Sequence, residues 1–378
     1  MKIGLFGDCN SIWVLSYVKE VLLRIDDCKV FIFSDKKLDI NDYDELDNVH
    51  VVECGAGNNS KKSRLGAIAY IFDVFRNVVR EKNFDCFHIH YVIKRRLFVT
   101  YLLRKYTKKT VATFWGSDLL RIEQSELETY SKYLHNVNEV TVGSEYMMKY
   151  IEKTFAKEIA DKTTVVRFGV KGLEAINKFK LSKKEAKQRI GFPENKTLIG
   201  IGYNGSRGQN HISVIKELSK LPEELKNKVF IVFPMSYGLE EEYLRMIEKE
   251  VDEVGCDYKY MLDYMDSDTI ANLCFATDIF VHAQETDAFS ASVQEYIGAG
   301  VLVYNPTWIV YEELDNNDAY YIRYESFGDL RNKLIEYLSN DNHVGDVKRL
   351  NNNKMIMYNL SSWSVLAIKW LKLYENSM

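Results

Sequence analysis

The chain of 378 residues has only four prolines, and no two of its six cysteines stand close enough to form a CxxC pair. Neither a zinc knuckle nor a dithiol redox motif is therefore encoded, and scattered cysteines are typical of buried thiols in a reducing compartment. No apolar run reaches the roughly 18 residues that span a bilayer. Asp8 interrupts the N-terminus before the apolar core of a signal peptide could form. These absences predict a cytoplasmic protein, attached at most to a membrane surface.

Charge of one sign is not in excess, because 50 Lys and Arg residues stand against 54 Asp and Glu residues, a formal net charge of -4. A dedicated nucleic-acid binder usually carries a basic excess, so the charge balance argues against that class. Hydrophobic residues make up 46% and charged residues 28%, which excludes a disordered or collagen-like chain. The length suits two domains of about 150–190 residues each.

Short apolar runs alternate with longer amphipathic segments in both halves of the chain. In the first half we expect strands at 2–6, 30–33, 50–52, 86–90, 111–114, 139–142 and 164–167. In the second half we expect strands at 198–202, 229–233, 257–261, 279–282 and 301–304. Strands separated by helices predict an α/β fold of two Rossmann-like, doubly wound domains that face a cleft.

Three helical segments stand out between and after these strands. Residues 58–82 carry an apolar stripe with the helical spacing of three and four residues, formed by Leu65, Ile68, Phe72, Phe75 and Val79. The lysine-rich segment 173–189 reads as a further helix near the boundary of the two domains. Residues 363–374 are apolar on more than one face, so this last helix is expected to pack against more than its neighbour in sequence.

The loop after the strand at 198–202 is a candidate phosphate site. It is rich in glycine, contains Arg207 and opens a helix at about residue 212. Glycines let a backbone approach a ligand, helix N-termini offer N–H groups to phosphate oxygens, and arginine suits a diphosphate. The dinucleotide fingerprint and the Walker A ending are both missing. A glycine-rich turn with a solvated arginine is the alternative.

The loop after the strand at 279–282 carries Asp287 and, about two helical turns later, Glu295. A helix that starts near Phe289 would aim its first amides at a phosphate or sugar, while a carboxylate further along accepts a pair of vicinal hydroxyls, as in ribose recognition. The alternative is a helix capped by Thr286 or Asp287 with surface acids.

In the first domain, Gly116 permits a tight turn after the strand at 111–114, and Asp118 is either a helix cap or a substrate ligand. Two pairs of aspartates have the DxD spacing of a cation site, at 42–44 and 266–268, but Asp266 precedes an apolar helix and reads better as a cap. His88 and His90 share one strand face, and without a third ligand they indicate metal only weakly.

Residues 94–109 contain seven basic side chains and no acid, with apolar residues among them. A basic amphipathic helix can dock on an anionic membrane surface, and a solvated helix face is the alternative.

The segment from Thr286 to Val301 resembles the E-x7-E region of family 4 glycosyltransferases of the two-lobed GT-B fold, with Asp287 and Glu295 at the spacing of the two acids. Arg207-Gly208 resembles the family's Lys-Gly, and residues 113–118 resemble its T-x-H-G-S-D segment. The terminal helix resembles the one that crosses back onto the first domain. This implies an N-terminal acceptor-side domain at 1–175, a nucleotide-sugar-binding domain at 176–355, and a helix at 356–378 that packs on the first domain.

The resemblance implies a hexosyltransferase that needs neither metal nor cofactor and uses a nucleoside diphosphate sugar, most commonly a UDP-sugar. Glu295 would bind the ribose, and Asp287 with the amides of Phe289 and Ser290 would hold the sugar and the β-phosphate. Arg207 would neutralise the leaving diphosphate. Further donor contacts are expected from Gly7, Asn204, Gly205, Ser206, Gln209, Asp263 and Tyr264, and acceptor or sugar contacts from Trp115 and Asp118.

Departures from the family pattern concern the acids and their neighbours. Asp287 stands for a glutamate, Ser290 for a glycine, and Trp115 for a histidine. Asn210-His211, the segment 234–238 and the Trp115-Gly116-x-Asp118 turn are similar to the acetamido-fucosyl transferases of lipid-linked sugars, which invert configuration, whereas family 4 retains it. A retaining transfer to a glycan or lipid-linked acceptor in cell-surface polysaccharide synthesis is predicted. A sugar-nucleotide epimerase of the same fold and a non-catalytic two-lobed sugar-binding protein are the alternatives.

Overall fold

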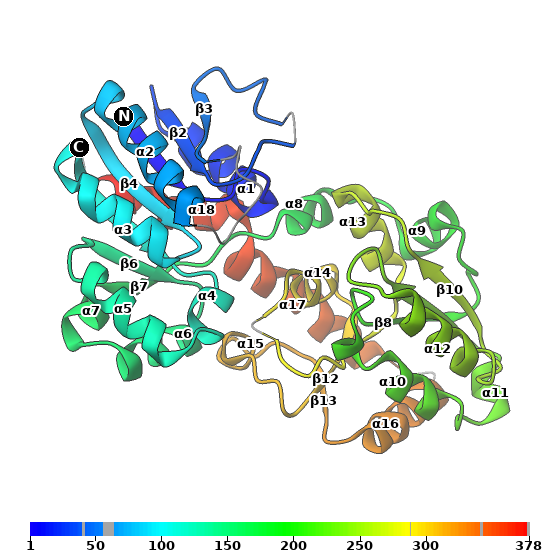
Figure 1. Cartoon of the computed structure of the whole chain (residues 1–378). Coiled ribbons are helices and arrows are strands. Elements are labelled where there is room, and N and C mark those ends of the chain that lie inside the picture. The colour runs from blue at the N-terminus through cyan, green and yellow to red at the C-terminus, as the bar shows by residue number, and fades with distance from the viewer. Residues whose placement is uncertain (40–41, 56–63, 288, 341–342, 376–378) are drawn as a thin grey trace. The chain divides into compact units, whose positions relative to one another are not determined.

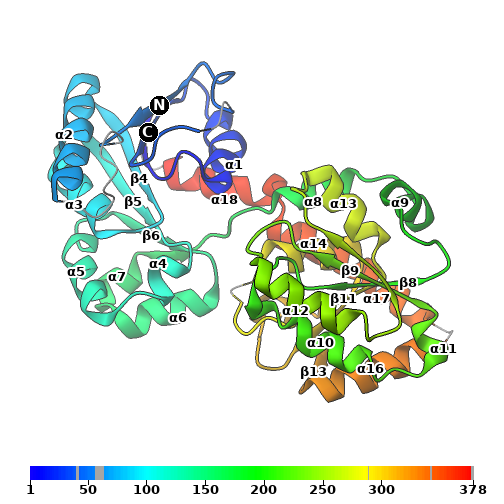
Figure 2. The same ribbon diagram turned by 45° about the vertical axis from the view of Figure 1, so that its right-hand side comes forward.

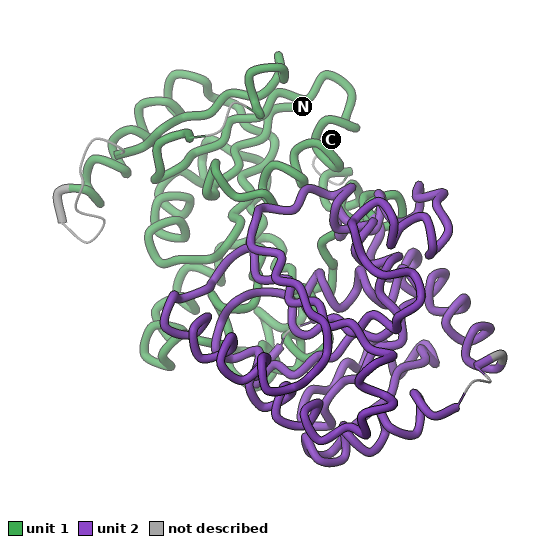
Figure 3. The backbone as a smooth tube through the Cα atoms, turned by 90° about the vertical axis from the view of Figure 1, so that its right-hand side faces the viewer, with its two compact units in different colours: residues 1–169, 363–378 green, residues 170–362 purple. Residues whose placement is uncertain are grey.

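The computed structural model describes residues 1–378 except 40–41, 56–63, 288, 341–342 and 376–378. The chain forms two compact units, coloured separately in Figure 3: residues 1–169 with 363–378, and residues 170–362. Each unit contains one parallel sheet with helices on both faces (Figure 1). The predicted fold class of two doubly wound α/β domains is therefore confirmed.

The sheet of the first unit has seven parallel strands in the order β3-β2-β1-β4-β5-β6-β7. The strands are β1 (Lys2–Phe6), β2 (Lys29–Ser34), β3 (Val49–Glu53), β4 (Phe84–His90), β5 (Thr107–Thr113), β6 (Glu139–Val142) and β7 (Thr163–Val165). The helices are α1 (Ile12–Glu20), α2 (Arg64–Glu81), α3 (Lys94–Leu103), α4 (Ser117–Leu120), α5 (Gln124–Leu134), α6 (Glu145–Thr154), α7 (Lys157–Asp161) and α18 (Trp363–Glu375), with short 3-10 turns at Leu22–Arg24 and Arg104–Tyr106.

Helix α18 completes the first unit although it comes last in the chain. Its tryptophans Trp363 and Trp370 are fully buried beside α1, and Trp370 Nε1 donates to the carbonyl of Arg167 at 2.8 Å. The hydroxyl of Tyr374 lies 2.8 Å from that of Tyr17. Burial of such large side chains contributes about 1.5–3 kcal/mol each, so the prediction that the terminal helix packs on the first domain is confirmed by these contacts.

The sheet of the second unit has six parallel strands in the order β10-β9-β8-β11-β12-β13. The strands are β8 (Thr197–Ile201), β9 (Val229–Pro234), β10 (Asp257–Met261), β11 (Ile279–Val281), β12 (Leu302–Pro306) and β13 (Ile322–Tyr324). The helices are α8 (Lys171–Lys178), α9 (Lys183–Ile190), α10 (His211–Leu218), α11 (Glu223–Lys226), α12 (Glu241–Val251), α13 (Ser267–Ala276), α14 (Ala291–Ala299), α15 (Glu312–Asp315), α16 (Phe327–Ser339) and α17 (Val344–Ser361), with a 3-10 turn η3 at Arg207–Gln209.

The structure divides the chain a few residues away from the expected boundaries at 175/176 and 355/356. Helix α8 packs on α13 and α14 and thus lies wholly in the second unit, as does α17 up to Ser361. The expected single helix at 173–189 is two helices. Phe179 leaves α8 to stack on Phe275 with ring centroids 4.5 Å apart, and Ser182 with Glu185 forms a capping box that starts α9. Strand β13 was not expected from the sequence.

Helix α2 packs against the sheet with a different apolar face from the one that the sequence predicted. Tyr70, Val74 and Val78 are fully buried against the sheet, whereas Ile68, Phe72 and Phe75 of the expected stripe are exposed. The expected start of this helix, residues 58–63, lies outside the described residues, as does the side chain of Leu65. The basic stretch 94–109 is only partly helical, because α3 and its 3-10 turn end at Tyr106 and β5 begins at Thr107.

Among the described residues, no helix combines the length and the apolarity that a membrane crossing requires. All six cysteines are buried and unpaired, as their spacing predicted.

Candidate functional site

The candidate donor site lies in the second unit at the carboxyl ends of β8 and β11. These two strands are hydrogen-bonded neighbours, so the loops that follow them leave the same edge of the sheet, where open α/β sheets bind ligands. The loop 202–210 follows β8, and the loop 282–290 follows β11 and leads into α14. The two loops that the sequence selected are thus brought together.

Glu295 lies on the second turn of α14 and is 7% exposed. In the described part of the chain its carboxyl group has no hydrogen-bond partner. It lies against Gly172 of α8, where a β-carbon would stand 2.0 Å from Glu295 Oε1. Burial raises the pKa of this carboxyl to about 8. A buried carboxyl without a partner costs folding free energy and marks a functional site more often than a structural one.

Asp287 accepts hydrogen bonds from two groups and lies near a third. The Tyr311 hydroxyl donates to Asp287 Oδ2 at 2.5 Å, the Ser290 amide donates to the same oxygen at 3.1 Å, and His282 Nε2 lies 3.5 Å from it. The carboxylate therefore fixes the turn that leads into α14. The Ser290 amide, which the resemblance assigned to a phosphate, already donates to Asp287 in this structure.

The protonation of His282 follows from its other neighbour, Asn305. Asn305 Nδ2 donates to the carbonyls of Pro306 and Ile309, so Asn305 Oδ1 must accept, and it lies 2.8 Å from His282 Nδ1. The proton is therefore assigned to Nδ1. Burial lowers the pKa of His282, and the charge of Asp287 opposes this only in part. Nε2 is thus an acceptor at neutral pH, and Asp287 depends on Tyr311 and Ser290.

Helix α14 begins two residues later than expected. Its N-cap is Ser290, whose Oγ accepts from the Val293 amide at 3.3 Å, and not Thr286 or Asp287. Phe289 has a left-handed φ of 73°, which a bulky residue adopts only when its surroundings enforce it. Here the Phe289 carbonyl accepts from Gln294 Nε2 at 2.8 Å, and its ring packs on Tyr311.

The loop after β8 is folded around Asn204. Asn204 Oδ1 accepts from the Ser206 amide at 2.9 Å, and the Gly205 amide donates to the Tyr237 carbonyl at 2.8 Å. A β-carbon on Gly205 would stand 2.4 Å from Leu239 Cβ, so the loop can pack here only with glycine. Gln209 is fully buried, and within the described residues its Nε2 has no hydrogen-bond acceptor.

Arg207 is turned toward acids of its own unit. Its guanidinium pairs with Glu240 and Glu242, each at 3.2 Å, and lies 5.0 Å from the centroid of the Tyr243 ring. The side chain is 47% exposed, so these pairs are weak. A diphosphate can therefore compete for this guanidinium at small cost.

The pKa values of two tyrosines, Tyr203 and Tyr237, respond to the acids of the loop and helix that follow β11. Burial raises the pKa of Tyr203, and the nearby charge of Asp287 raises it further. Burial also raises the pKa of Tyr237, with smaller contributions from Glu295 and Asp287. The two acids of the motif and the loop after β8 thus belong to one cluster.

Asp263 and Tyr264, which follow edge strand β10, are both exposed, Tyr264 to 82%.

The first unit places its candidates at the carboxyl ends of β1 and β5. A β-carbon on Gly7 would stand 3.2 Å from Val14 Cγ2, so this turn is tightly packed. Asp118 is fully buried and accepts from the amides of Val92, Trp115 and Gly116 at 2.6, 2.8 and 2.9 Å. It lies in the first turn of α4, and its carboxylate holds the Trp115 turn instead of capping the helix. Burial raises its pKa to about 6 against these three hydrogen bonds.

Two of the three weaker metal candidates, Asp266 and the pair of His88 and His90, have structural roles. Asp266 caps α13, its Oδ1 accepting from the Thr269 amide at 2.8 Å. His88 and His90 are fully buried among aromatic rings, and burial lowers the pKa of His88 to about 3. Among the described residues, no three His, Cys, Asp or Glu side chains gather as a metal site would need.

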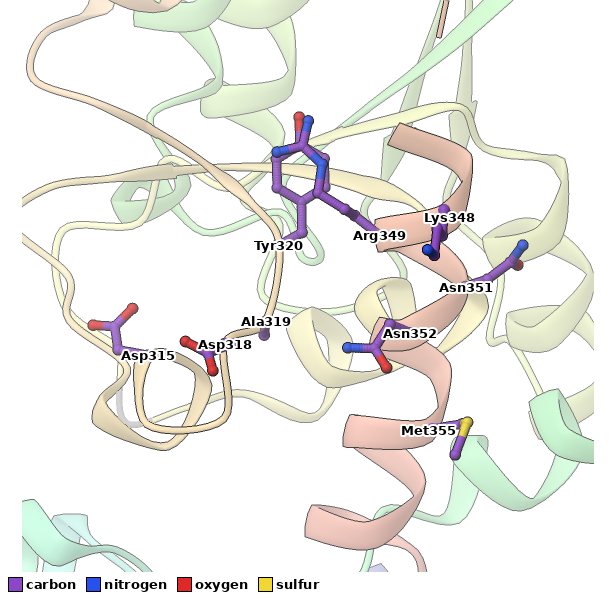
Figure 4. Close-up of a pocket in the computed structure, with 9 residues that line it drawn as sticks. All are labelled: Asp315, Asp318, Ala319, Tyr320, Lys348, Arg349, Asn351, Asn352 and Met355. Atoms are coloured by element: carbon purple, nitrogen blue, oxygen red, sulfur yellow. The ribbon is translucent and has the colours of Figure 1, made fainter. Parts of the chain in front are cut away.

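One hollow of the second unit lies away from these loops. It encloses about 900 Å³ between the end of α15 and α17 (Figure 4). Its lining residues are Asp315, Asp318, Ala319, Tyr320, Lys348, Arg349, Asn351, Asn352 and Met355. Arg349 stacks on Tyr320 with 3.7 Å to the ring centroid, and no residue of the candidate site lines the hollow.

Sequence reasoning missed His282, Tyr311 and Gly172 as members of the site. His282 had a signal, because it ends a strand directly before the acidic loop. Tyr311 and Gly172 had none, since each reaches the site from a different part of the unit.

Residues 2–144 match the family described as Glycosyl transferase 4-like, and no curated protein sequence matches the chain. A glycosyltransferase from Rickettsia africae ESF-5 has a TM-score of 0.79 at 18% identity, covering 100% of this chain and 98% of its own. Sucrose-phosphate synthase from Thermosynechococcus elongatus has a TM-score of 0.74 at 15% identity, with 100% and 98% covered. Anabaena HepE, solved with UDP and glucose, has a TM-score of 0.72 at 16% identity, with both chains covered fully.

These comparisons confirm the GT-B fold and the resemblance to family 4. The prediction of a glycosyltransferase is confirmed at the level of the fold and of the family that matches most of the first unit.

Proposed function

We propose that the protein transfers a sugar from a nucleoside diphosphate sugar to a glycan or lipid-linked acceptor, without a metal ion and with retention of configuration. The observation that carries this proposal is the buried, unpartnered carboxyl of Glu295 beside the Asp287 turn. Vicinal ribose hydroxyls would provide the two donors that this carboxylate lacks. Since HepE was solved with UDP and with UDP-glucose, a UDP-sugar is the first donor to test.

The proposed roles follow the geometry of the loops. Asn204, Gly205, Ser206 and Gln209 would contact the donor from the loop after β8, and Asp263 with Tyr264 would flank the base. Asp287 would hold the start of α14, with Phe289 and Ser290, against the sugar and the β-phosphate. The first unit would contribute Gly7, Trp115 and the turn held by Asp118.

Chemistry would consist of one displacement at the anomeric carbon. The bond to the diphosphate oxygen breaks as the acceptor oxygen bonds on the same face, and the leaving phosphate takes the acceptor proton. Arg207 would leave its two acids and neutralise the diphosphate.

The setting that we propose is the cytoplasmic side of a membrane, in cell-surface polysaccharide synthesis. A lipid-linked acceptor would lie at that surface, and the exposed cations near α3 support such a position.

Incubation with a panel of nucleotide sugars, followed by mass spectrometry, tests the proposal. Release of nucleoside diphosphate with a glycosylated acceptor or free sugar supports a transferase. Formation of an isomeric nucleotide sugar would instead indicate an epimerase, and binding without turnover would indicate a sugar-binding protein. Either of the last two results would overturn the proposal.

Replacing Arg207 by Met is expected to lower kcat with a UDP-sugar about 100-fold or more, as loss of a charge-stabilising group does at other leaving oxygens. The control is Arg245→Met on α12, which removes an arginine that is also paired with an acid, Glu241, and is more exposed than Arg207 (74% against 47%). Steady-state kinetics distinguish the two. Equal, small effects of both substitutions would contradict the role of Arg207.

A further inference from the structure

Helix α2 presents an apolar stripe to solvent in addition to its buried face. Ile68 and Phe72 are each 62% exposed and Phe75 is 48% exposed. Their spacing of four and three residues places them on one side of the helix. The sheet-facing side is already filled by Tyr70 and Val74. The stripe is therefore not needed for the core of the first unit. Scattered single apolar residues are normal on a protein surface, but three on one side of a helix form a contiguous patch that calls for a function.

Helix α3 extends the stripe with Leu102, which is 45% exposed. The two helices lie side by side in Figures 1 and 2 and contact each other. Arg95 of α3 lies over the ring of Tyr70 of α2, 4.5 Å from its centroid. Both helices connect parallel strands and run in the same direction, so Leu102, two turns beyond Arg95, lies alongside the end of the stripe near Phe75.

Basic side chains border the stripe. Arg76 and Arg80 of α2 are 68% and 71% exposed, and their only acid neighbours are at 3.9 and 3.4 Å among the described residues. The neighbouring helix α3 and the 3-10 turn that follows it add the exposed Lys94, Arg104 and Lys105.

The remaining cations of the stretch 94–109 serve the fold. Arg95 and Arg96 pair with Asp35, and Lys108 pairs with Asp85 at 2.8 Å. Lys109 is buried and pairs with Glu139 at 2.5 Å. The basic stretch 94–109 therefore offers fewer free cations to a membrane than the sequence indicated. Its exposed part adjoins the apolar stripe of α2.

We propose that Ile68, Phe72, Phe75 and Leu102, with their basic border, form a docking surface for an anionic lipid bilayer. Aromatic and aliphatic side chains enter the boundary between headgroups and acyl chains, and arginine and lysine beside them pair with anionic headgroups. The whole chain has a net charge of -4, so attraction to an anionic surface has to come from a local basic border such as this one. The inference rests on the proposed function only for its purpose, which is to bring the first unit to a membrane-borne acceptor.

Co-sedimentation of the full chain with vesicles tests this surface. We expect binding to vesicles of phosphatidylglycerol and phosphatidylcholine in equal parts, weak binding to phosphatidylcholine alone, and weaker binding at high salt. The variant Ile68→Ser, Phe72→Ser, Phe75→Ser should bind at least tenfold less. Its side chains are exposed, so its thermal unfolding should match that of the unchanged chain.

The matched control removes two exposed apolar residues of the second unit, Val347→Ser with Met355→Ser, and should bind like the unchanged chain. Equal binding of the stripe variant and the unchanged chain, or no binding by either, would overturn the proposal. So would a concentration-dependent dimer, seen by light scattering, that the stripe variant loses while neither protein binds vesicles. Vesicle binding is measured without nucleotide sugar, so a failure of the proposed transfer activity leaves this result unaffected.

Discussion

The Glu295→Gln variant is expected to be more stable than the unchanged protein at alkaline pH and to bind the donor far more weakly. Burial raises the pKa of Glu295 to about 8, against an ordinary value of 4.5. The folded protein therefore holds a proton that the unfolded chain loses above about pH 4.5, and ionisation of the buried group destabilises the fold. Glutamine does not titrate and avoids this cost.

The unchanged protein loses stability, relative to the Glu295→Gln variant, as the pH rises between the unfolded and folded pKa values of Glu295. Below about pH 4.5 the carboxyl is protonated in both states and has no pH-dependent effect; between about 4.5 and 8 the unchanged protein loses stability relative to the variant, up to about 5 kcal/mol. Calorimetric melting at about pH 5 and about pH 9 measures this difference, which should grow with pH. A melting-temperature difference that stays constant between the two would contradict the buried, unpartnered state.

Donor affinity should change in the opposite sense. The ionised carboxylate accepts both ribose hydroxyls, so affinity of the unchanged protein for UDP should rise with pH up to about 8, by at most roughly tenfold per pH unit. Titration calorimetry of the Glu295→Gln variant should give weaker binding with no such rise. Glu285→Gln, an exposed acid before the same helix, is the control and should keep the pH dependence.

Local patterns account for what could be predicted of the fold. Strand positions follow from apolar runs, and the spacing from Asp287 to Glu295 is a property of one continuous segment. Helix α2 shows the limit of such patterns, because its sequence has two apolar sides. The spacing of three and four residues indicated only the side that is exposed in the structure, and packing against the sheet decides that Val74 is buried and that Phe72 is exposed.

The candidate site was predictable in its acids and not in their surroundings. Tyr311 reaches Asp287 from the chain that follows β12, and Gly172 reaches Glu295 from α8. Such contacts depend on how distant elements pack, which no local spacing encodes. Asp118 illustrates the same point. Its carboxylate accepts hydrogen bonds from three backbone amides, one of them just beyond the end of β4, and these bonds occupy a side chain that the sequence offered as a substrate ligand.

The Gly172→Ala variant is expected to lose donor affinity at least tenfold although Gly172 itself carries no group that could bind a donor. Its new β-carbon would lie 2.0 Å from Glu295 Oε1 and 2.6 Å from Cδ, distances that no packed atoms tolerate. The backbone of α8 is held by its helix, so the carboxyl end of the flexible glutamate has to move. The change thus displaces the proposed ribose ligand without altering its chemistry.

The stability of the Gly172→Ala variant shows whether its loss of donor affinity comes from displacement of Glu295 or from unfolding of the protein. Alanine is a better helix former than glycine, and Gly345→Ala in α17, where a β-carbon meets no atom within 4 Å, provides the control. That control should keep donor affinity in calorimetry. Because both substitutions at the site act through one carboxyl group, Gly172→Ala combined with Glu295→Gln should bind no more weakly than the weaker single variant. Additive losses would mean that Gly172 acts independently of Glu295, and unchanged affinity of Gly172→Ala would show that the position of this carboxyl does not matter for the donor.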